Sequence, residues 1–346
     1  WDLARGCIRG VIEQTGVDPH DIAAVSTTCM REGIVLYDKD GQEIWACANV
    51  DARSDDEVAQ LVHMNPELEK QIYRESGQTY ALGALPRLFW VKNKMPEVYE
   101  KTAMCTMFND WLIYKMTGVF SSEPSNACTT GIFDLKARDW DDKIAASIGL
   151  KTGIFPKISE CGTVVAQVGA KGAAETGLAE GTPVVAGGGD AQLGCVGVGV
   201  VDANQAAIFG GSFWQYEYNT DEAKTDEHCR VRVNCHSVPG IWQYEALAFK
   251  PGMVMRWYRD AFCQYEKELS KTTGRDPYDL MNEKAKDIPA GCYGMMCAFS
   301  DVMNYISWRH ASPMFINFDF DPDKFNRYTF YRAIMENTAM VTYGHM

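Results

Sequence analysis

The sequence predicts an α/β fold with two domains, and three observations support this prediction. Its 346 residues exceed the size of a typical single domain, and a hydrophobic content of 46% is enough for sizeable cores. Strand-like and helix-like patterns alternate along the chain. In the middle, the apolar run 183–186 reads as a short buried strand that passes through three glycines into a helical pattern.

Asp190 follows the three glycines, residues 187–189, and is the first candidate for a functional side chain. The glycines remove every side chain just before the carboxylate, so that backbone and ligand can approach closely. Leu193, Val196 and Val200 then recur at helical spacing, which predicts a helix with Asp190 as its N-cap. A carboxylate at such a strand-to-helix junction is well placed to face a cleft.

A glycine turn about twenty residues further on is the second candidate. Two runs of apolar and aromatic residues, 206–209 and 213–218, flank Gly210, Gly211 and Ser212 and predict a hairpin. The backbone N–H groups and the hydroxyl of such a turn can cradle a phosphate. The local pattern is equally compatible with a capped helix followed by an ordinary hairpin, because glycine-rich motifs also occur where no ligand binds.

The charge and hydropathy of the chain exclude some classes of partner. A net charge of −13 and an isoelectric point near 5.0 argue against nucleic acids and anionic membranes. An anionic ligand would therefore need backbone amides or a metal ion. No window approaches ~18 uninterrupted apolar residues, so we expect no membrane span. The first residues lack the regions of a signal peptide and resemble the middle of a helix, so the chain is expected to begin inside a domain.

Twelve cysteines are dispersed along the chain without a Cys-x-x-Cys pair. Buried free thiols in a reducing cytoplasm explain this distribution better than disulfides do. Two pairs resemble metal ligands, His228 with Cys229 and Cys235 with His236. The strand pattern between them separates the pairs by ~20 Å, which is too far for one tetrahedral zinc ion. We therefore predict no protein-ligated metal site.

The other elements follow from periodicity, caps and turns. Helices are predicted at 2–14, from 55 onward, and at 86–94, 96–101, 108–118, 253–268, 277–286 and 327–341. Gly16 is expected to end the first helix. Strands are predicted at 22–26, 34–37, 43–45, 163–168, 231–237 and 242–249. Residues 121–126 are expected to form a polar loop, and four side chains of the long helix to lie in a core: Met255, Trp257, Tyr258 and Phe262.

Arg31 and Glu32 admit two interpretations. In an extended chain these adjacent side chains would point to opposite faces, and one of them would simply be solvated. A bend would instead offer a polyol one donor fork and one acceptor. The local pattern favours the solvated surface. Asp51 and Arg53 read equally well as capping groups of the helix that follows.

The order of these motifs resembles the FGGY carbohydrate kinases, sugar and polyol kinases of the actin-like ATPase superfamily. The matching segments lie in sequence over essentially the whole chain: 33–38, 51–53, 110–118, 177–190 and 331–336. The resemblance implies an α/β, actin-like (ribonuclease H-like) two-domain kinase fold. It also implies that residues 1–186 form the substrate-binding domain and residues 187–346 the ATP-binding domain.

Within the family, the chain resembles the autoinducer-2 kinases, through segments 26–37, 45–53, 122–127, 210–215 and 255–263. This implies that ATP and Mg²⁺ serve to phosphorylate the primary 5-hydroxyl of 4,5-dihydroxypentane-2,3-dione, a small quorum-sensing signal. The alternatives are a kinase of xylulose, gluconate, erythritol or glycerol, and a non-catalytic sugar-binding module. The implied partners are these small molecules, without nucleic acid or membrane, and a homodimer is compatible with the sequence.

The resemblance assigns roles to individual residues. Asp190 matches the catalytic aspartate that accepts the proton of the substrate hydroxyl. Arg31 and Glu32 match the pair that hydrogen-bonds the polyol in glycerol kinases. Together with Asp190, these two side chains form the implied substrate site.

Other matches include departures from the family pattern. Gly210, Gly211 and Ser212 match the hairpin that binds the ATP phosphates, although serine lacks the methyl group of the family's threonine. Pro124 stands where glycerol kinases have a substrate-binding tyrosine, so that contact is lost. The family opens with a phosphate motif that precedes Trp1 and closes with an adenosine motif beyond residue 346. The fold is therefore expected to be incomplete at both ends.

Overall fold

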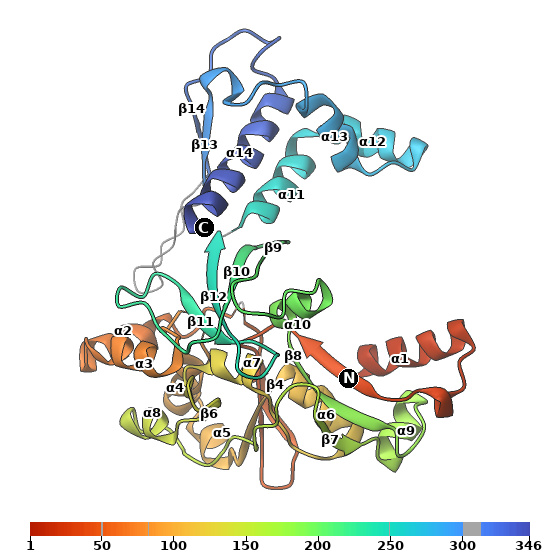
Figure 1. The fold of residues 1–346 in the computed structure, drawn as a ribbon, viewed down its shortest axis with the longest axis vertical. Coiled ribbons are helices and arrows are strands. Elements are labelled where there is room, and N and C mark those ends of the chain that lie inside the picture. The colour runs from red at the N-terminus through yellow and green to blue at the C-terminus, as the bar shows by residue number, and fades with distance from the viewer. Residues whose placement is uncertain (50, 82, 249, 300–312) are drawn as a thin grey trace. The chain divides into compact units, whose positions relative to one another are not determined.

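The computed structural model describes residues 1–49, 51–81, 83–248, 250–299 and 313–346. The chain forms two compact units (Figure 1). The first contains Trp1–Gln205 and Asn219–Tyr244, and the second contains Ala206–Tyr218 and Glu245–Met346. The first change of unit falls after Gln205, whereas the domain boundary that the family resemblance implies lies after residue 186.

A mixed sheet at the centre of the first unit carries Asp190 at one end. Strands β1 (Val25–Cys29) and β8 (Pro183–Gly189) pair in parallel, and β7 (Val164–Gln167) pairs antiparallel with β8. An apolar cluster beside this sheet includes Ile113, Met116 and Val184. The helices that surround it are α1 (Asp2–Thr15), α6 (Phe108–Thr117) and α9 (Ala170–Thr176).

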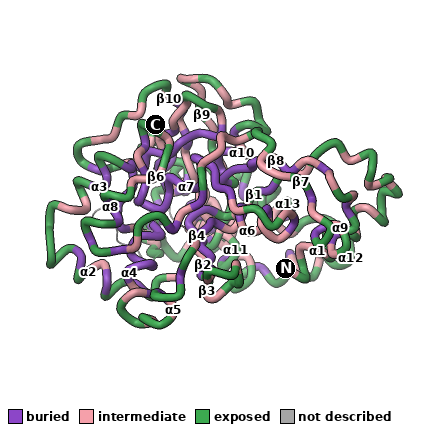
Figure 2. Tube along the Cα trace, turned by 90° about the horizontal axis from the view of Figure 1, so that it is seen from below, coloured by how far each residue is buried: buried purple, intermediate pink, exposed green. Residues whose placement is uncertain are grey.

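A second, antiparallel sheet of the first unit has the order β3-β2-β4. Its middle strand β2 is buried along its whole length (Figure 2), and its side chains join a large apolar core with Leu61, Leu85 and Leu88. The strands are β2 (Ile34–Tyr37), β3 (Glu43–Cys47) and β4 (Met104–Met107). The neighbouring helices are α2 (Asp55–Met64), α3 (Leu68–Ser76), α4 (Ala84–Lys94) and α5 (Pro96–Lys101).

Short elements complete the first unit. A small core joins Ala127, Cys128 and Phe133 to Val233 and Cys235, so that segments about a hundred residues apart in sequence pack together. The elements are α7 (Pro124–Ala127), β5 (Phe133–Asp134), β6 (Asp139–Trp140), α8 (Asp142–Ser147), α10 (Asp190–Gly197), β11 (Arg232–Cys235) and two single-turn helices, Pro19–Asp21 and Cys128–Thr130.

The second unit is built on its last helix. Helix α14 (Arg327–His345) contributes Tyr331, Ala333 and Ile334 to an apolar core that also contains Tyr258 and Met281. The helices around it are α11 (Pro251–Phe262), α12 (Gln264–Thr273), α13 (Pro277–Ala285) and the single turn Cys292–Gly294. The strands are β9 (Ala206–Gly210), β13 (Met296–Ala298) and β14 (Met314–Ile316), together with β10 (Trp214–Thr220) and β12 (Trp242–Ala248), which each run from one unit into the other.

Most predicted elements are confirmed, and local chemistry explains the agreement. Gly16 ends α1 with φ 64°, a left-handed conformation that glycine adopts without steric cost. Helix α5 spans the predicted residues because Pro96 occupies its first turn. Two predicted segments include residues outside the described ones, Val50 in the match to 45–53 and Phe249 at the end of the strand 242–249.

Several predictions of local structure were wrong or incomplete. The strand expected at 22–26 begins later and spans Val25–Cys29. The helix expected at 253–268 is interrupted at Cys263, and Trp257 and Phe262 are about half exposed rather than buried. The segment 121–126 is buried and includes a helical turn, because Glu123 caps it and Pro124 starts it. Helix α9 was not predicted, since its residues have no apolar stripe.

All twelve cysteines lie in described positions and have free thiols; nine of them are buried. Cys235 lies in β11, where its amide donates a hydrogen bond to the Cys128 sulfur. Burial lowers the pKa of His236 to about 4, so this side chain is neutral at pH 7. Among the described residues, no three His, Cys, Asp or Glu side chains converge in a geometry for a metal ion. No helix in the described part of the chain has the length and apolar character needed to cross a bilayer.

Candidate functional site

The three glycines before Asp190 permit a close approach between parts of the protein itself. A Cβ atom on Gly187 would collide with the carbonyl oxygen of Thr27. A Cβ atom on Gly188 would lie 2.7 Å from the Ser237 hydroxyl. One on Gly189 would lie 2.6 Å from Oε1 of Gln192 and 2.9 Å from the Arg31 side chain. Glycine is therefore required at these positions by packing, before any ligand is considered.

Asp190 is the first residue of α10, and Gly189 is the N-cap. The predicted N-cap role of Asp190 was therefore wrong by one position. The predicted apolar face was also wrong, because α10 buries Ala191, Gln192 and Cys195, whereas Val196 is 41% exposed. Helix α10 therefore buries two small side chains and one amide rather than a Leu/Val stripe.

The carboxylate of Asp190 is available to solvent, since 59% of its side chain is exposed. One oxygen, Oδ1, accepts a hydrogen bond from the Ala191 amide at 2.9 Å. The same oxygen lies 3.7 Å from Nε of Arg31, whose side chain is only 5% exposed. An exposed carboxylate is thus held next to a buried guanidinium at the end of a strand. This arrangement can accept a proton from one ligand group while a fixed cation orients another.

Arg31 and Glu32 are both buried, at 4% and 3% exposure. The interpretation as a solvated surface was therefore wrong. The chain bends here because Glu32 adopts a left-handed backbone conformation with φ 63°, which is uncommon for a residue other than glycine. The bend sends the two side chains to different neighbours, Arg31 to Asp190 and Glu32 to Arg232.

Arg232, which the sequence did not single out, holds the Glu32 carboxylate. Its NH1 lies 2.7 Å from Oε1 of Glu32, and both side chains are almost completely buried. Its Nε donates to Oε1 of Gln78 at 2.8 Å. The Gln78 amide in turn donates to Asn234 Oδ1 at 3.0 Å. Only the alternation of strand residues around Arg232 was visible in the sequence, because its partner Glu32 lies 200 positions away.

Arg87 fixes the backbone around Glu32. Its guanidinium donates hydrogen bonds to three carbonyl oxygens, those of Glu32, Asn49 and Asp51. Arg87 lies on α4 and is 3% exposed. One buried cation thereby ties the bend to the segment that carries Asp51 and Arg53, which pair with each other at 2.7 Å.

A buried polar network lies behind the glycine segment. Glu123 accepts hydrogen bonds from the amide and the hydroxyl of Ser125, both at 2.6 Å. It also accepts from the Asn126 amide, the Asn109 side chain and the Cys161 thiol. Burial raises the pKa of Glu123, and the bonds from Ser125 and Cys161 act in the opposite direction. The Ser125 hydroxyl then accepts a hydrogen bond from the Gly189 amide at 3.0 Å.

The hairpin of Gly210, Gly211 and Ser212 belongs to the second unit, and the predicted hairpin is confirmed by the pairing of β9 with β10. A Cβ atom on Gly210 would overlap the Trp214 ring. The Gly211 amide donates to the Phe213 carbonyl oxygen at 2.8 Å, within the turn. All three turn residues are exposed. Their role in phosphate binding stays a prediction.

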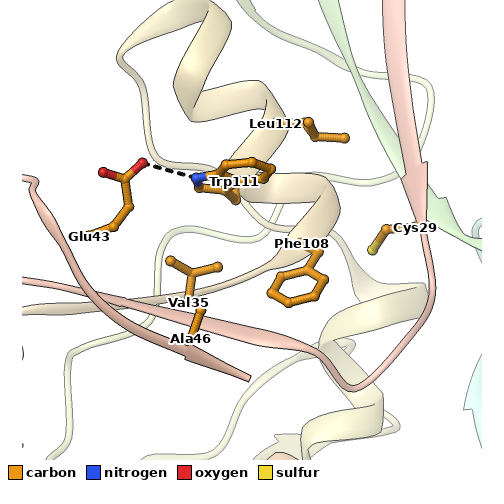
Figure 3. A pocket seen from close by; sticks show the side chains of 7 residues that line it. All are labelled: Cys29, Val35, Glu43, Ala46, Phe108, Trp111 and Leu112. Carbon is orange, nitrogen blue, oxygen red and sulfur yellow. Dashed lines mark hydrogen bonds between the residues drawn. The ribbon is translucent and has the colours of Figure 1, made fainter. Parts of the chain in front are cut away.

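An apolar pocket of about 470 Å³ lies between α6 and the strands β1, β2 and β3 (Figure 3). Seven residues line it: Cys29, Val35, Glu43, Ala46, Phe108, Trp111 and Leu112. The Glu43 carboxylate already accepts hydrogen bonds from Trp111 and Lys115. A sugar site needs several polar groups that converge on the ligand. The lining of this pocket therefore lacks the character of a sugar site.

Comparison with known families identifies the class of protein. Residues 1–197 match the N-terminal domain of the FGGY family of carbohydrate kinases. The chain belongs to this family. The resemblance drawn from the sequence motifs is thereby confirmed.

Relatives within the family are more specific. The chain is 47% identical over 343 residues to the autoinducer-2 kinase of Enterobacter sp. strain 638, and 46% identical to that of Escherichia coli strain K12. Each match covers 99% of this chain and 65% of the relative. The chain thus spans about two thirds of the length of these relatives.

Solved structures confirm the actin-like two-domain kinase fold. A xylulose kinase from Rhodospirillum rubrum matches with a TM-score of 0.82 at 22% identity. The match covers 100% of this chain and 68% of the xylulose kinase. A gluconate kinase from Lactobacillus acidophilus matches with a TM-score of 0.80 at 19% identity. The match covers 98% of this chain and 66% of the gluconate kinase. At such identities the likeness concerns the fold and not the substrate.

Proposed function

We propose that the chain forms part of an ATP-dependent kinase that phosphorylates a primary hydroxyl of a small linear sugar-like substrate. The observation that carries this proposal is the exposed Asp190 carboxylate, held 3.7 Å from the buried Arg31 at the end of β8. In this proposal Asp190 is the general base. Family membership supports the same reaction class.

The transferred phosphoryl group passes through a loose transition state, so positioning and charge stabilisation contribute more than activation of the nucleophile. A carboxylate is a sufficient base, because the hydroxyl proton leaves late. Arg31 has a stem packed against Gly189, which limits its rotamers and directs its guanidinium toward Asp190. Arg31 would thereby orient the substrate while Asp190 accepts its proton.

ATP would be the phosphoryl donor, and the exposed turn Gly210–Ser212 is our candidate for its phosphates. Magnesium commonly binds to one or two carboxylates together with substrate phosphates. The described residues offer no cluster of three ligands, so Mg²⁺ would be coordinated chiefly by the ATP phosphates and water. Mg²⁺ would enter with ATP and neutralise phosphate charge.

We propose autoinducer-2, phosphorylated at its 5-hydroxyl, as the substrate. Two relatives that match 99% of this chain at 46–47% identity are named autoinducer-2 kinases. Kinases of xylulose, gluconate, erythritol or glycerol remain the competing assignment, because one methylene or hydroxyl changes binding by only about 1–3 kcal/mol in an apolar pocket.

Assays on the full open reading frame that encodes this chain would test the proposal. We expect phosphate transfer from ATP to autoinducer-2, detected as ADP release and as a phosphomonoester by ³¹P NMR. Its kcat/KM should exceed the values for xylulose, gluconate, erythritol and glycerol. A higher value for another polyol would replace the substrate. Thermal stabilisation by a sugar without any response to ATP–Mg²⁺ would identify a binding module instead.

Replacing Arg31 with alanine should weaken substrate binding more than ATP binding. A charge-assisted hydrogen bond is worth about 1.5–3 kcal/mol, which corresponds to a roughly 10- to 150-fold rise in the substrate Kd. Isothermal titration with each ligand separately would measure both affinities. Arg5→Ala, on the exposed helix α1, provides the control. Equal losses for both ligands would mean that Arg31 has a structural role.

A further inference from the structure

The amide of Gly189 marks the point where the backbone turns from β8 into α10, one residue before Asp190. That amide donates its hydrogen bond to the Ser125 hydroxyl, at 3.0 Å. Ser125 is completely buried and lies 64 positions earlier in the chain, on α7. A side chain from a separate element therefore determines where this turn of the backbone lies.

The direction of the Ser125 hydroxyl is set by Glu123. The hydroxyl proton is donated to Oε2 of Glu123, at 2.6 Å, so the oxygen is left to accept from Gly189. Glu123 receives five donors, which are the Ser125 amide and hydroxyl, the Asn126 amide, the Asn109 side chain and the Cys161 thiol. A carboxylate surrounded in this way has little freedom to rotate. Its fixed position therefore determines the direction in which the Ser125 hydroxyl donates its hydrogen bond.

Packing leaves little space for Ser125 and Glu123 to shift. A Cβ atom on Gly188 would lie 3.0 Å from the Ser125 hydroxyl and 2.7 Å from that of Ser237. Glu123 is 1% exposed. Asp190, by contrast, projects into solvent with 59% of its side chain exposed and has Arg31 beside it at 3.7 Å. The position of the exposed Asp190 carboxylate is therefore determined through the buried backbone that precedes it.

We infer that Ser125 and Glu123 are positioning residues for phosphoryl transfer, acting through the Gly189 amide to place the Asp190 carboxylate. This inference rests on the proposed role of Asp190 as general base. Both residues act through the backbone and do not touch the reacting atoms. A displacement of about 1 Å at a catalytic group can cost roughly 10²-fold in rate, so the effect should appear in kcat.

The test uses the full open reading frame with ATP and autoinducer-2. Ser125→Ala should lower kcat by roughly 10- to 100-fold and leave both KM values nearly unchanged, because binding groups stay in place while the base moves. Ser122→Ala is the matched control. Ser122 is also buried, on the same segment, but its hydroxyl donates to Asp110 rather than contacting the Gly189 amide. Its kcat should stay close to that of the parent protein.

Glu123→Gln keeps the shape of the side chain but replaces one accepting oxygen with a donor. In the position of Oε2, the amide nitrogen would face the Ser125 amide and hydroxyl and the Cys161 thiol; in the position of Oε1, it would face the Asn126 amide and the Asn109 side chain. Either orientation disturbs the hydrogen bonds that orient the Ser125 hydroxyl. We expect a loss of kcat similar to that of Ser125→Ala. Thermal melting would reveal whether Ser125→Ala folds. If it does not, Glu123→Gln still tests the positioning role.

A double-variant comparison separates positioning from general destabilisation. In an Asp190→Asn background, Ser125→Ala should cause little further loss of kcat, because the base through which it acts is absent. A loss by the same factor in both backgrounds would overturn the inference, and so would normal kcat in both Ser125→Ala and Glu123→Gln. Normal turnover of Asp190→Asn itself would instead overturn the proposed function.

Discussion

Asp190→Asn should lower turnover by roughly 10²–10⁴-fold and leave ATP binding largely intact. Asparagine has the same shape, and its side-chain oxygen can still accept the hydrogen bond that the Ala191 amide donates to Asp190. The start of α10 should therefore be retained while the base is lost. Steady-state kinetics of ADP release with autoinducer-2, together with the thermal shift produced by ATP–Mg²⁺, would measure the two effects separately.

Asp202→Asn is a matched control for this experiment. Asp202 is an exposed carboxylate of the first unit whose side chain accepts from the Gln205 amide rather than lying beside Arg31. The same substitution there should leave turnover unchanged. Near-normal turnover of Asp190→Asn, or a similar loss in both variants, would contradict the assignment of Asp190 as the base.

Arg232→Met should lower the free energy of unfolding by about 3–5 kcal/mol, because it leaves the Glu32 carboxylate buried without its guanidinium. Methionine fills much of the same volume, so that lost packing contributes little. The Gln78 carbonyl oxygen also loses its donor. Urea unfolding followed by tryptophan fluorescence would measure the change.

Two further variants check the cause of that loss. Arg230→Met removes an arginine two positions away, whose side chain is 62% exposed where it pairs with Asp226. Its effect should be much smaller, because water screens a pair with an exposed cation. Adding Glu32→Gln to Arg232→Met should restore part of the stability, since the buried charge is then removed. Equal losses in Arg230→Met and Arg232→Met, or no recovery in the double variant, would contradict a buried ion pair.

The sequence was sufficient for elements whose ends carry local signals. Gly16 and Pro96 mark their helices by backbone preferences that act within one turn. The apolar run 34–37 forms β2 as predicted. The helix 253–268 was predicted as continuous, because nothing in the local pattern marks the break at Cys263.

The buried polar contacts of the site could not be read from local pattern. Residues 121–126 look like any solvated polar loop, and only the combination of Glu123 with Pro124 signals a capped turn. The bond from Gly189 to Ser125 spans 64 positions, and the pair of Glu32 with Arg232 spans 200. Such contacts exist only once the fold has brought the elements together. Local pattern and family resemblance together pointed to Arg31, Glu32 and Asp190, but neither identified the groups that hold them.

The three glycines at 187–189 have a consequence for protein engineering. Each is limited by a different neighbour, the Thr27 backbone, the Ser237 hydroxyl or the Arg31 side chain. A mutational library meant to change the accepted sugar should therefore keep these codons constant. Diversity is better placed at positions whose side chains have room, since variants at 187–189 would be lost to misfolding before any screen could rank their selectivity.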